Sequence, residues 1–135
     1  MTPKSLSSEI DLAYESNKNK YNNLVSWDSL RLSKRRLCEI ASILGGKRLS
    51  AMLRNYATDY KSWNHGMPDL ILWDLDTNRI KFSEVKSEND RLSEVQRAWI
   101  AYLSQSAIDV EVCYVNRAEG QDGIEQFEVF TENKN

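Results

Sequence analysis

Two acidic residues and a lysine, Asp69, Glu84 and Lys86, lie at the open end of one predicted β-hairpin. The hairpin comprises residues 70–85, where two runs of strand-forming residues surround the turn sequence Leu75-Asp76-Thr77-Asn78. A turn centred on this sequence pairs Asp69 with Glu84 across the two strands. Because side chains alternate between the faces of a strand, Lys86 shares a face with both acids.

This pairing places two carboxylates close together at the edge of a predicted sheet. Directly opposed residues have Cβ atoms about 4.5–5.5 Å apart, and two negative charges at about 5 Å repel by roughly 3 kcal/mol at an effective dielectric near 20. Either one acid keeps a proton, or a cation lies between them. Oxygen ligands of this kind suit Mg²⁺ or Mn²⁺, which polarises phosphate and activates water. The alternative is a surface hairpin with a Glu–Lys pair, which contributes about 0–1 kcal/mol.

The composition limits the other chemistry that is available to the chain. Its 135 residues, 41% hydrophobic and 28% charged, predict one globular domain. Two distant cysteines and a single histidine do not match a zinc site, and they favour a reducing compartment, cytoplasmic or nuclear. No apolar run is long enough for a membrane span, and the N-terminus lacks a secretory signal, so no membrane partner is expected.

The net charge of −2 conceals a basic and an acidic half. Residues 1–67 contain 11 Lys/Arg and 6 Asp/Glu, whereas residues 68–135 contain 7 and 14. We expect Lys47, Arg48 and Arg54, which flank the glycine pair after Leu44, to contact DNA phosphates without reading sequence. The alternative is that these basic residues form the solvated faces of two helices.

Periodicity predicts helices on both sides of the hairpin. Ser33 is a candidate N-cap for a helix that ends at Gly45-Gly46, and Ser93-Glu94-Val95-Gln96 matches a capping box. The expected helices cover residues 6–24, 33–44, 48–56 and 93–104, and further strands cover residues 108–115 and 123–130. This order predicts an α/β fold, a small mixed β-sheet flanked by α-helices.

The four tryptophans differ in their expected positions. Trp27, Trp73 and Trp99 lie on apolar faces, which favours the core over base stacking. Val95 is also predicted to lie on the inward face of the helix at 93–104. Trp63 lies in a polar segment, where a wedge against DNA is the less favoured alternative.

Several segments resemble a known family. The stretches GMPDLILW, KFSEVKSENDRLSEVQRAWIAYL and VEVCYV are similar to the virus-type replication-repair nuclease (VRR-NUC) domain, most closely to its form at the C-terminus of the Fanconi-associated nucleases. The similarity continues upstream through LVSWDSL (24–30) and LGGKRLSAMLRNYATDY (44–60), and it covers about residues 24–115. It implies the restriction-endonuclease-like PD-(D/E)XK fold and metal-dependent hydrolysis of branched, flapped or double-stranded DNA.

The resemblance also implies a role for individual residues. Asp69, Glu84 and the carbonyl of Val85 match the positions that hold Mg²⁺ or Mn²⁺. Asp69, Glu84, Lys86 and Gln96 match the catalytic positions, with Lys86 as the catalytic lysine. Gln96 has a second interpretation as the capping partner of the serine three residues before it.

A loop beside the site completes the matching motif. Arg91, in Asn89-Asp90-Arg91, is expected to contact a DNA phosphate. A salt bridge with Asp90 or Glu94 is an equally good interpretation of this arginine.

Two departures from the family pattern affect these expectations. Ser87-Glu88 follows the lysine where the family often has Gly-Pro. A further acidic ligand comes from an upstream helix in the family, and here Glu9 and Glu15 are its candidates. We therefore divide the chain into two parts. Residues 1–23 are expected to be an N-terminal helix, the remnant of a longer region, and residues 24–135 are expected to be the nuclease domain. The missing N-terminal part of a longer protein is then one candidate partner.

These features favour a metal-dependent DNA nuclease in one of two settings. One is repair or phage DNA metabolism. The other is an antibacterial toxin, which would be delivered into a target cell's cytoplasm and neutralised by an immunity protein. The alternative from another class is a non-catalytic DNA- or protein-binding module that has lost its upstream metal ligand.

Overall fold

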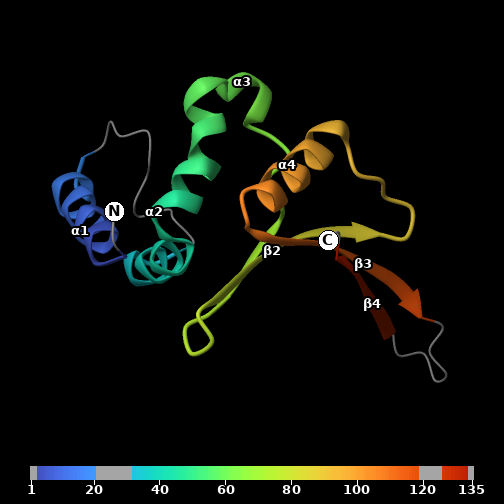
Figure 1. Cartoon of the computed structure of the whole chain (residues 1–135). Coiled ribbons are helices and arrows are strands. Elements are labelled where there is room, and N and C mark those ends of the chain that lie inside the picture. The colour runs from blue at the N-terminus through green and yellow to red at the C-terminus, as the bar shows by residue number, and fades with distance from the viewer. Residues whose placement is uncertain (1–2, 21–31, 119–125, 134–135) are drawn as a thin grey trace.

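The computed structural model describes residues 3–20, 32–118 and 126–133 (Figure 1). The segment at 24–30 with Trp27, the end of the first predicted helix and the predicted start of the last strand lie outside the described residues. The helices are α1 (Pro3–Asn17), α2 (Lys34–Thr58), α3 (Tyr60–Trp63) and α4 (Glu94–Gln105). The strands are β1 (Leu70–Asp74), β2 (Arg79–Ser87), β3 (Asp109–Ala118) and β4 (Gln126–Asn133).

The four strands form one mixed sheet in the order β1-β2-β3-β4. β1 and β2 are the predicted hairpin, and its register, Ile71 with Phe82 and Trp73 with Ile80, confirms the predicted pairing. β2 and β3 are parallel and are joined by α4, whereas β3 and β4 are antiparallel. The predicted α/β class, a small mixed sheet with flanking helices, is confirmed.

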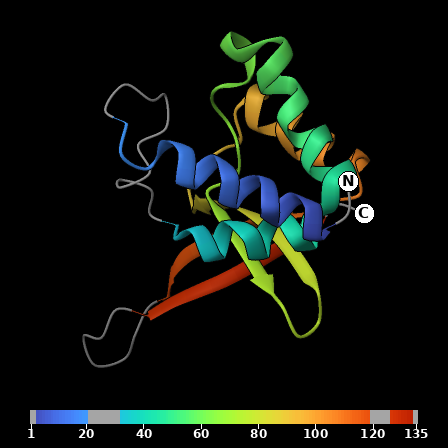
Figure 2. The ribbon, with the colours of Figure 1, turned by 90° about the vertical axis from the view of Figure 1, so that its left-hand side faces the viewer.

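One face of the sheet packs against α2 and α4. Phe82 of β2, Val112 of β3 and Trp99 and Leu103 of α4 are at most 1% exposed, and Leu44 brings α2 into the same cluster. Alternation along β2 places Glu84 and then Lys86 on this core face after Ile80 and Phe82. Figure 2 shows α1 lying across the first half of α2. Among the described helices, none has the length and apolar character needed to cross a membrane.

The helix α2 is divided at the predicted glycine break. Gly45 has φ 69° and ψ 165°, which ends the first helical segment, and Gly46 begins the second. The Arg48 guanidinium donates to the carbonyls of Ile43 and Leu44 at 2.9 and 2.8 Å. These bonds satisfy two carbonyl groups that the break leaves without helical partners.

Other predicted boundaries and faces differ from the structure in small ways. Helix α1 ends at Asn17, whose side chain donates to the carbonyl of Ala13 and so competes with continued helical bonding. The short α3 was not predicted. Trp99 is buried as expected, but Val95 is 37% exposed and the prediction that it faces inward was wrong. Trp73 is half-buried: it packs against the core cluster, and its indole N–H donates to Glu39 on α2.

Candidate active site

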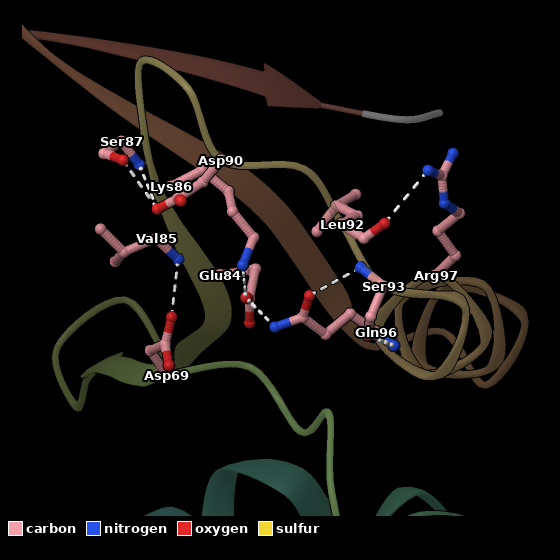
Figure 3. A network of polar contacts seen from close by, with 10 residues as sticks. All are labelled: Asp69, Glu84, Val85, Lys86, Ser87, Asp90, Leu92, Ser93, Gln96 and Arg97. Atoms are coloured by element: carbon pink, nitrogen blue, oxygen red, sulfur yellow. Dashed lines mark hydrogen bonds and ion pairs between the residues drawn. The ribbon is translucent and has the colours of Figure 1, made fainter.

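Glu84 is a buried acid near the end of β2. Its side chain is 1% exposed, and its Oε1 accepts hydrogen bonds from the Gln96 amide and lies 2.8 Å from the Lys86 ammonium (Figure 3). Within the described part of the chain, no group donates to the other oxygen, Oε2. A buried ionisable oxygen without a partner is costly unless another ligand satisfies it.

Asp69 lies on the opposite side of the hairpin opening, one residue before β1. Its carboxylate is held by the backbone of β2, because the Val85 N–H donates to Oδ2 at 2.9 Å (Figure 3). The residue is exposed, and Oδ1 accepts no hydrogen bond from any described residue. The hairpin therefore brings Asp69 beside the Glu84–Val85 segment, as the register predicts. Each carboxylate has its own hydrogen-bond partners.

Lys86 lies two residues beyond Glu84 and on the same face. Its side chain is 11% exposed, so the ammonium is largely removed from water and is held against one carboxylate. This cation offsets the negative charge of Glu84 while leaving the second carboxylate oxygen free. The Glu-x-Lys spacing on one strand produces this pair directly.

The first turn of α4 provides the amide that contacts Glu84. Ser93 is the N-cap, and its hydroxyl accepts from the Gln96 backbone N–H at 3.2 Å. The side-chain oxygen of Gln96, Oε1, accepts from the Ser93 backbone N–H at 2.9 Å. This is the predicted capping box. The same Gln96 side chain also donates to Glu84. One Gln96 side chain therefore both completes the cap and contacts Glu84, and its catalytic role stays a prediction.

Gly66 sets the approach of the segment before Asp69 to α4. Its φ is +86°, and a Cβ built there would lie 2.9–3.0 Å from Val95 and from the backbone of Gln96. Only glycine combines this conformation with such close contact. The Gly-x-Pro-Asp motif thus positions the aspartate loop against the start of α4, a contact that the sequence does not reveal.

Asp90 closes the loop between β2 and α4. Its carboxylate accepts from the hydroxyl of Ser87 at 2.7 Å and from its backbone N–H at 3.2 Å. The hydroxyl bond is the main cause that lowers the pKa of Asp90 below its ordinary value. Ser87, a departure from the family pattern, therefore has a structural role here. Glu88 and Arg91 in this loop are exposed, and among the described residues Arg91 forms no salt bridge with Asp90 or Glu94.

The predicted DNA-contact residues differ in their surroundings. Lys47, Arg54 and Arg91 are exposed, so their side chains are accessible to a ligand. Arg48 is half-buried, and its guanidinium is used at the break in α2. Contact of these four residues with DNA stays a prediction.

Neither acidic candidate for an upstream ligand joins the site. Glu15 pairs with Lys18 at 2.6 Å on α1, and Glu9 lies exposed on the same helix. No three Asp, Glu, His or Cys side chains within residues 3–20, 32–118 and 126–133 form a cluster that could hold a metal ion. A metal site built on the predicted ligands would therefore have two carboxylates, those of Asp69 and Glu84, and backbone oxygen.

That smaller set of ligands fits Mg²⁺ or Mn²⁺. The unsatisfied Oε2 of Glu84 and the free Oδ1 of Asp69 are hard oxygen donors, and Asp69 is bonded to the backbone of Val85, whose carbonyl is the third predicted ligand. Mg²⁺ commonly binds through one or two carboxylates and keeps several water molecules. The neighbouring Lys86 ammonium has no lone pair and therefore does not compete as a ligand.

Trp63 is a packing residue beside this region. Its ring meets Trp99 edge to face at 4.9 Å, and its carbonyl accepts from the Trp99 indole. A pocket of about 280 Å³ lies between Trp63 and the Val95 side of α4. The contacts favour the packing role of Trp63 over a wedge against DNA.

Comparison with known families assigns most of the chain to one of them. The sequence profile of the VRR-NUC domain matches residues 2–117. The chain belongs to the VRR-NUC domain family. The match begins within two residues of the N-terminus and so includes α1, which packs on α2 through Lys34 and Asp11 at 3.0 Å. The division of the chain at residue 24 stays a prediction.

Curated relatives of this VRR-NUC domain are much longer proteins. The Fanconi-associated nuclease 1 homolog of Oryza sativa is 46% identical over 96 residues, which are 68% of this chain and 10% of that protein. The Arabidopsis thaliana homolog is 40% identical over 111 residues, 79% of this chain and 12% of that protein. Human Fanconi-associated nuclease 1 is 41% identical over 93 residues, 69% and 9% of the two chains. The chain thus spans about a tenth of these relatives.

A solved structure shares the fold. The crystal structure of paFAN1 bound to 2-nucleotide 5′-flap DNA with a gap superposes with a TM-score of 0.76 and 26% identity. The match covers 88% of this chain and 21% of paFAN1. The VRR-NUC chain therefore has the restriction-endonuclease-like fold that the resemblance implied.

Proposed function

We propose that this VRR-NUC chain is a metal-dependent DNA nuclease of the PD-(D/E)XK type. The observation that carries the proposal is the buried Glu84, whose Oε1 is held by Lys86 and Gln96 while Oε2 has no partner among the described residues. Evolution rarely retains such an oxygen for stability, because an unsatisfied buried carboxylate destabilises the fold. Membership of a nuclease family adds independent support.

Asp69, Glu84 and the Val85 carbonyl would hold Mg²⁺ or Mn²⁺. When bound there, the ion supplies Lewis-acid stabilisation of a phosphate and acidifies a water molecule. Asp69 is oriented by the Val85 N–H, and Glu84 by Gln96 and Lys86. The Lys86 ammonium lies 2.8 Å from Glu84, so it would stabilise negative charge that develops on the phosphate during attack.

Flapped or branched DNA is the substrate class that we propose. The support is the likeness to a paFAN1 structure bound to 5′-flap DNA, together with the exposed basic side chains of Lys47, Arg54 and Arg91. Phosphate contacts of this kind position DNA without reading its sequence. The match covers only about a fifth of paFAN1, so the binding of flap DNA by paFAN1 does not establish a flap preference for this chain. That preference has to be measured on this chain itself.

Cleavage of 5′-flapped and supercoiled DNA with Mg²⁺, Mn²⁺ or EDTA tests the proposal. We expect metal-dependent cutting by the wild type and a loss of at least 10²-fold in Asp69→Asn, Glu84→Gln and Lys86→Ala, because each change removes a ligand or the charge beside it.

The same sheet provides matched controls. Lys81 of β2 and Glu111 of β3 form another Lys–Glu ion pair, at 2.9 Å. This pair lies on the face of the sheet opposite to Glu84 and Lys86. Lys81→Ala and Glu111→Gln should keep cleavage within a few-fold of wild type. Cutting that persists in EDTA or in Asp69→Asn would reject the proposal, and DNA binding without cutting would favour the non-catalytic module.

A further inference from the structure

The Gln96 side chain connects the start of α4 to Glu84. Its Oε1 accepts from the backbone N–H of Ser93, and its Nε2 donates to Glu84 Oε1 (Figure 3). The Ser93 hydroxyl in turn accepts from the backbone N–H of Gln96. Both ends of the amide are therefore in use, one by the helix cap and one by the acid.

These partners fix which way the amide points. In the flipped orientation, Nε2 would face the Ser93 N–H, donor against donor, and Oε1 would face a carboxylate, acceptor against acceptor. The Ser93 N–H thus selects the orientation in which Gln96 donates to Glu84. With Oε1 of Glu84 occupied by Gln96 and Lys86, Oε2 is the oxygen left for a ligand.

We propose that Ser93 is a positioning residue for the metal-binding carboxylate of Glu84 and acts through Gln96. This inference rests on the proposed function, because it assigns a use to the free Oε2 of Glu84. This N-cap would then do more than begin a helix, since it would also hold the Glu84 side chain in its metal-binding rotamer before the metal binds.

Ser93 and Ser33 form a natural matched pair for the test. Both are N-caps in extended conformation, with φ −67° and −66°, and both hydroxyls accept from the N–H three residues on. Proline adopts this φ, so Ser→Pro removes both the hydroxyl and the backbone N–H and keeps the φ of the cap. Ser→Ala removes the hydroxyl alone. Arg36 takes the place of Gln96 in the Ser33 cap, so that cap has no comparable side-chain link.

The experiment measures two properties of Ser93→Pro, Ser93→Ala, Ser93→Thr, Ser33→Pro and Ser33→Ala. Calorimetry gives the Kd for Mn²⁺, and the side-chain ¹⁵N–¹H₂ signals of Gln96 in the metal-free protein report its bond to Glu84. We expect Ser93→Pro to raise the Kd about tenfold and to move the Gln96 signals to solvent-exposed values. Ser93→Ala should have a smaller effect, and Ser93→Thr and both Ser33 variants should match the wild type.

The inference is overturned if folded Ser93→Pro keeps the wild-type Kd and Gln96 signals, or if Ser33→Pro weakens Mn²⁺ binding as much. Should Ser93→Pro not fold, Ser93→Ala decides by the same two readouts. A wild type that binds no Mn²⁺ would reject the proposed function instead, and the Gln96 signals of the metal-free variants would still decide whether Ser93 positions Glu84.

Discussion

The sequence predicts some contacts of the buried Glu84 carboxylate and not others. The Glu-x-Lys spacing predicts that Glu84 and Lys86 share a strand face, and the structure places them 2.8 Å apart. The spacing does not predict that Gln96 also uses Oε1 and that Oε2 is left without a partner within the described chain. Those contacts depend on where α4 begins relative to β2, which is a property of the tertiary structure.

Asp90 gives a prediction about pH at the same scale. Because the Ser87 hydroxyl bond lowers the pKa of Asp90, the stability that this bond contributes is present above the unfolded-state pKa and is lost as the pH falls through the lowered folded-state pKa. A ¹³C carboxyl NMR titration should therefore find the Asp90 pKa below the ordinary aspartate value. Ser87→Ala should raise it towards that value. An unchanged pKa in Ser87→Ala would contradict the assigned cause.

At the scale of elements, the active-site geometry depends on how the Gly66 segment packs against α4. Gly66→Ala introduces a Cβ about 2.9–3.0 Å from Val95 and Gln96 at a positive φ, and we expect a loss of roughly 2–4 kcal/mol in unfolding free energy with a large loss of cleavage. Denaturant unfolding and the flap assay check both effects.

Gly45 is the matched control for this substitution. It also has a positive φ, but a Cβ there would have no atom within 4 Å. Gly45→Ala should therefore lose about 1–3 kcal/mol of unfolding free energy from backbone strain alone, because φ 69° with ψ 165° is a glycine conformation, and it should retain cleavage in the folded fraction. Equal losses of unfolding free energy and of cleavage in Gly66→Ala and Gly45→Ala would contradict this prediction. They would show that the contact of Gly66 with α4 adds nothing to the effect of backbone conformation.

Local signals in the sequence predict most elements well. The hairpin register and the Ser93 cap follow from alternation and from capping chemistry, and both are present. The exposed Val95 was assigned inward because helical periodicity alone does not tell which edge of the apolar stripe faces the sheet. The early end of α1 and the four-residue α3 depend on single polar groups, Asn17 and the Asp59 cap, whose weak effects periodicity does not capture.

At the scale of the whole molecule, the described residues of the candidate site come from the sheet, the segment just before it, and α4. Asp69 comes from the hairpin opening, Glu84 and Lys86 from β2, and Gln96 from the helix that joins β2 to β3. These elements occupy a small part of the much longer Fanconi-associated nuclease relatives. The chemical step is therefore expected to depend on this domain, whereas recognition of a particular DNA structure has to be measured on the chain as it stands.

The most direct test of the account is a crystal structure of the protein soaked in Mn²⁺, with anomalous diffraction at the manganese edge. We predict an anomalous peak about 2.1 Å from Asp69 Oδ1 and Glu84 Oε2 and within coordination distance of the Val85 carbonyl, with the Lys86 ammonium still beside Glu84 Oε1. Glu84→Gln should abolish the peak. A protein that binds Mn²⁺ only elsewhere, with Oε2 still unligated, would contradict the central claim.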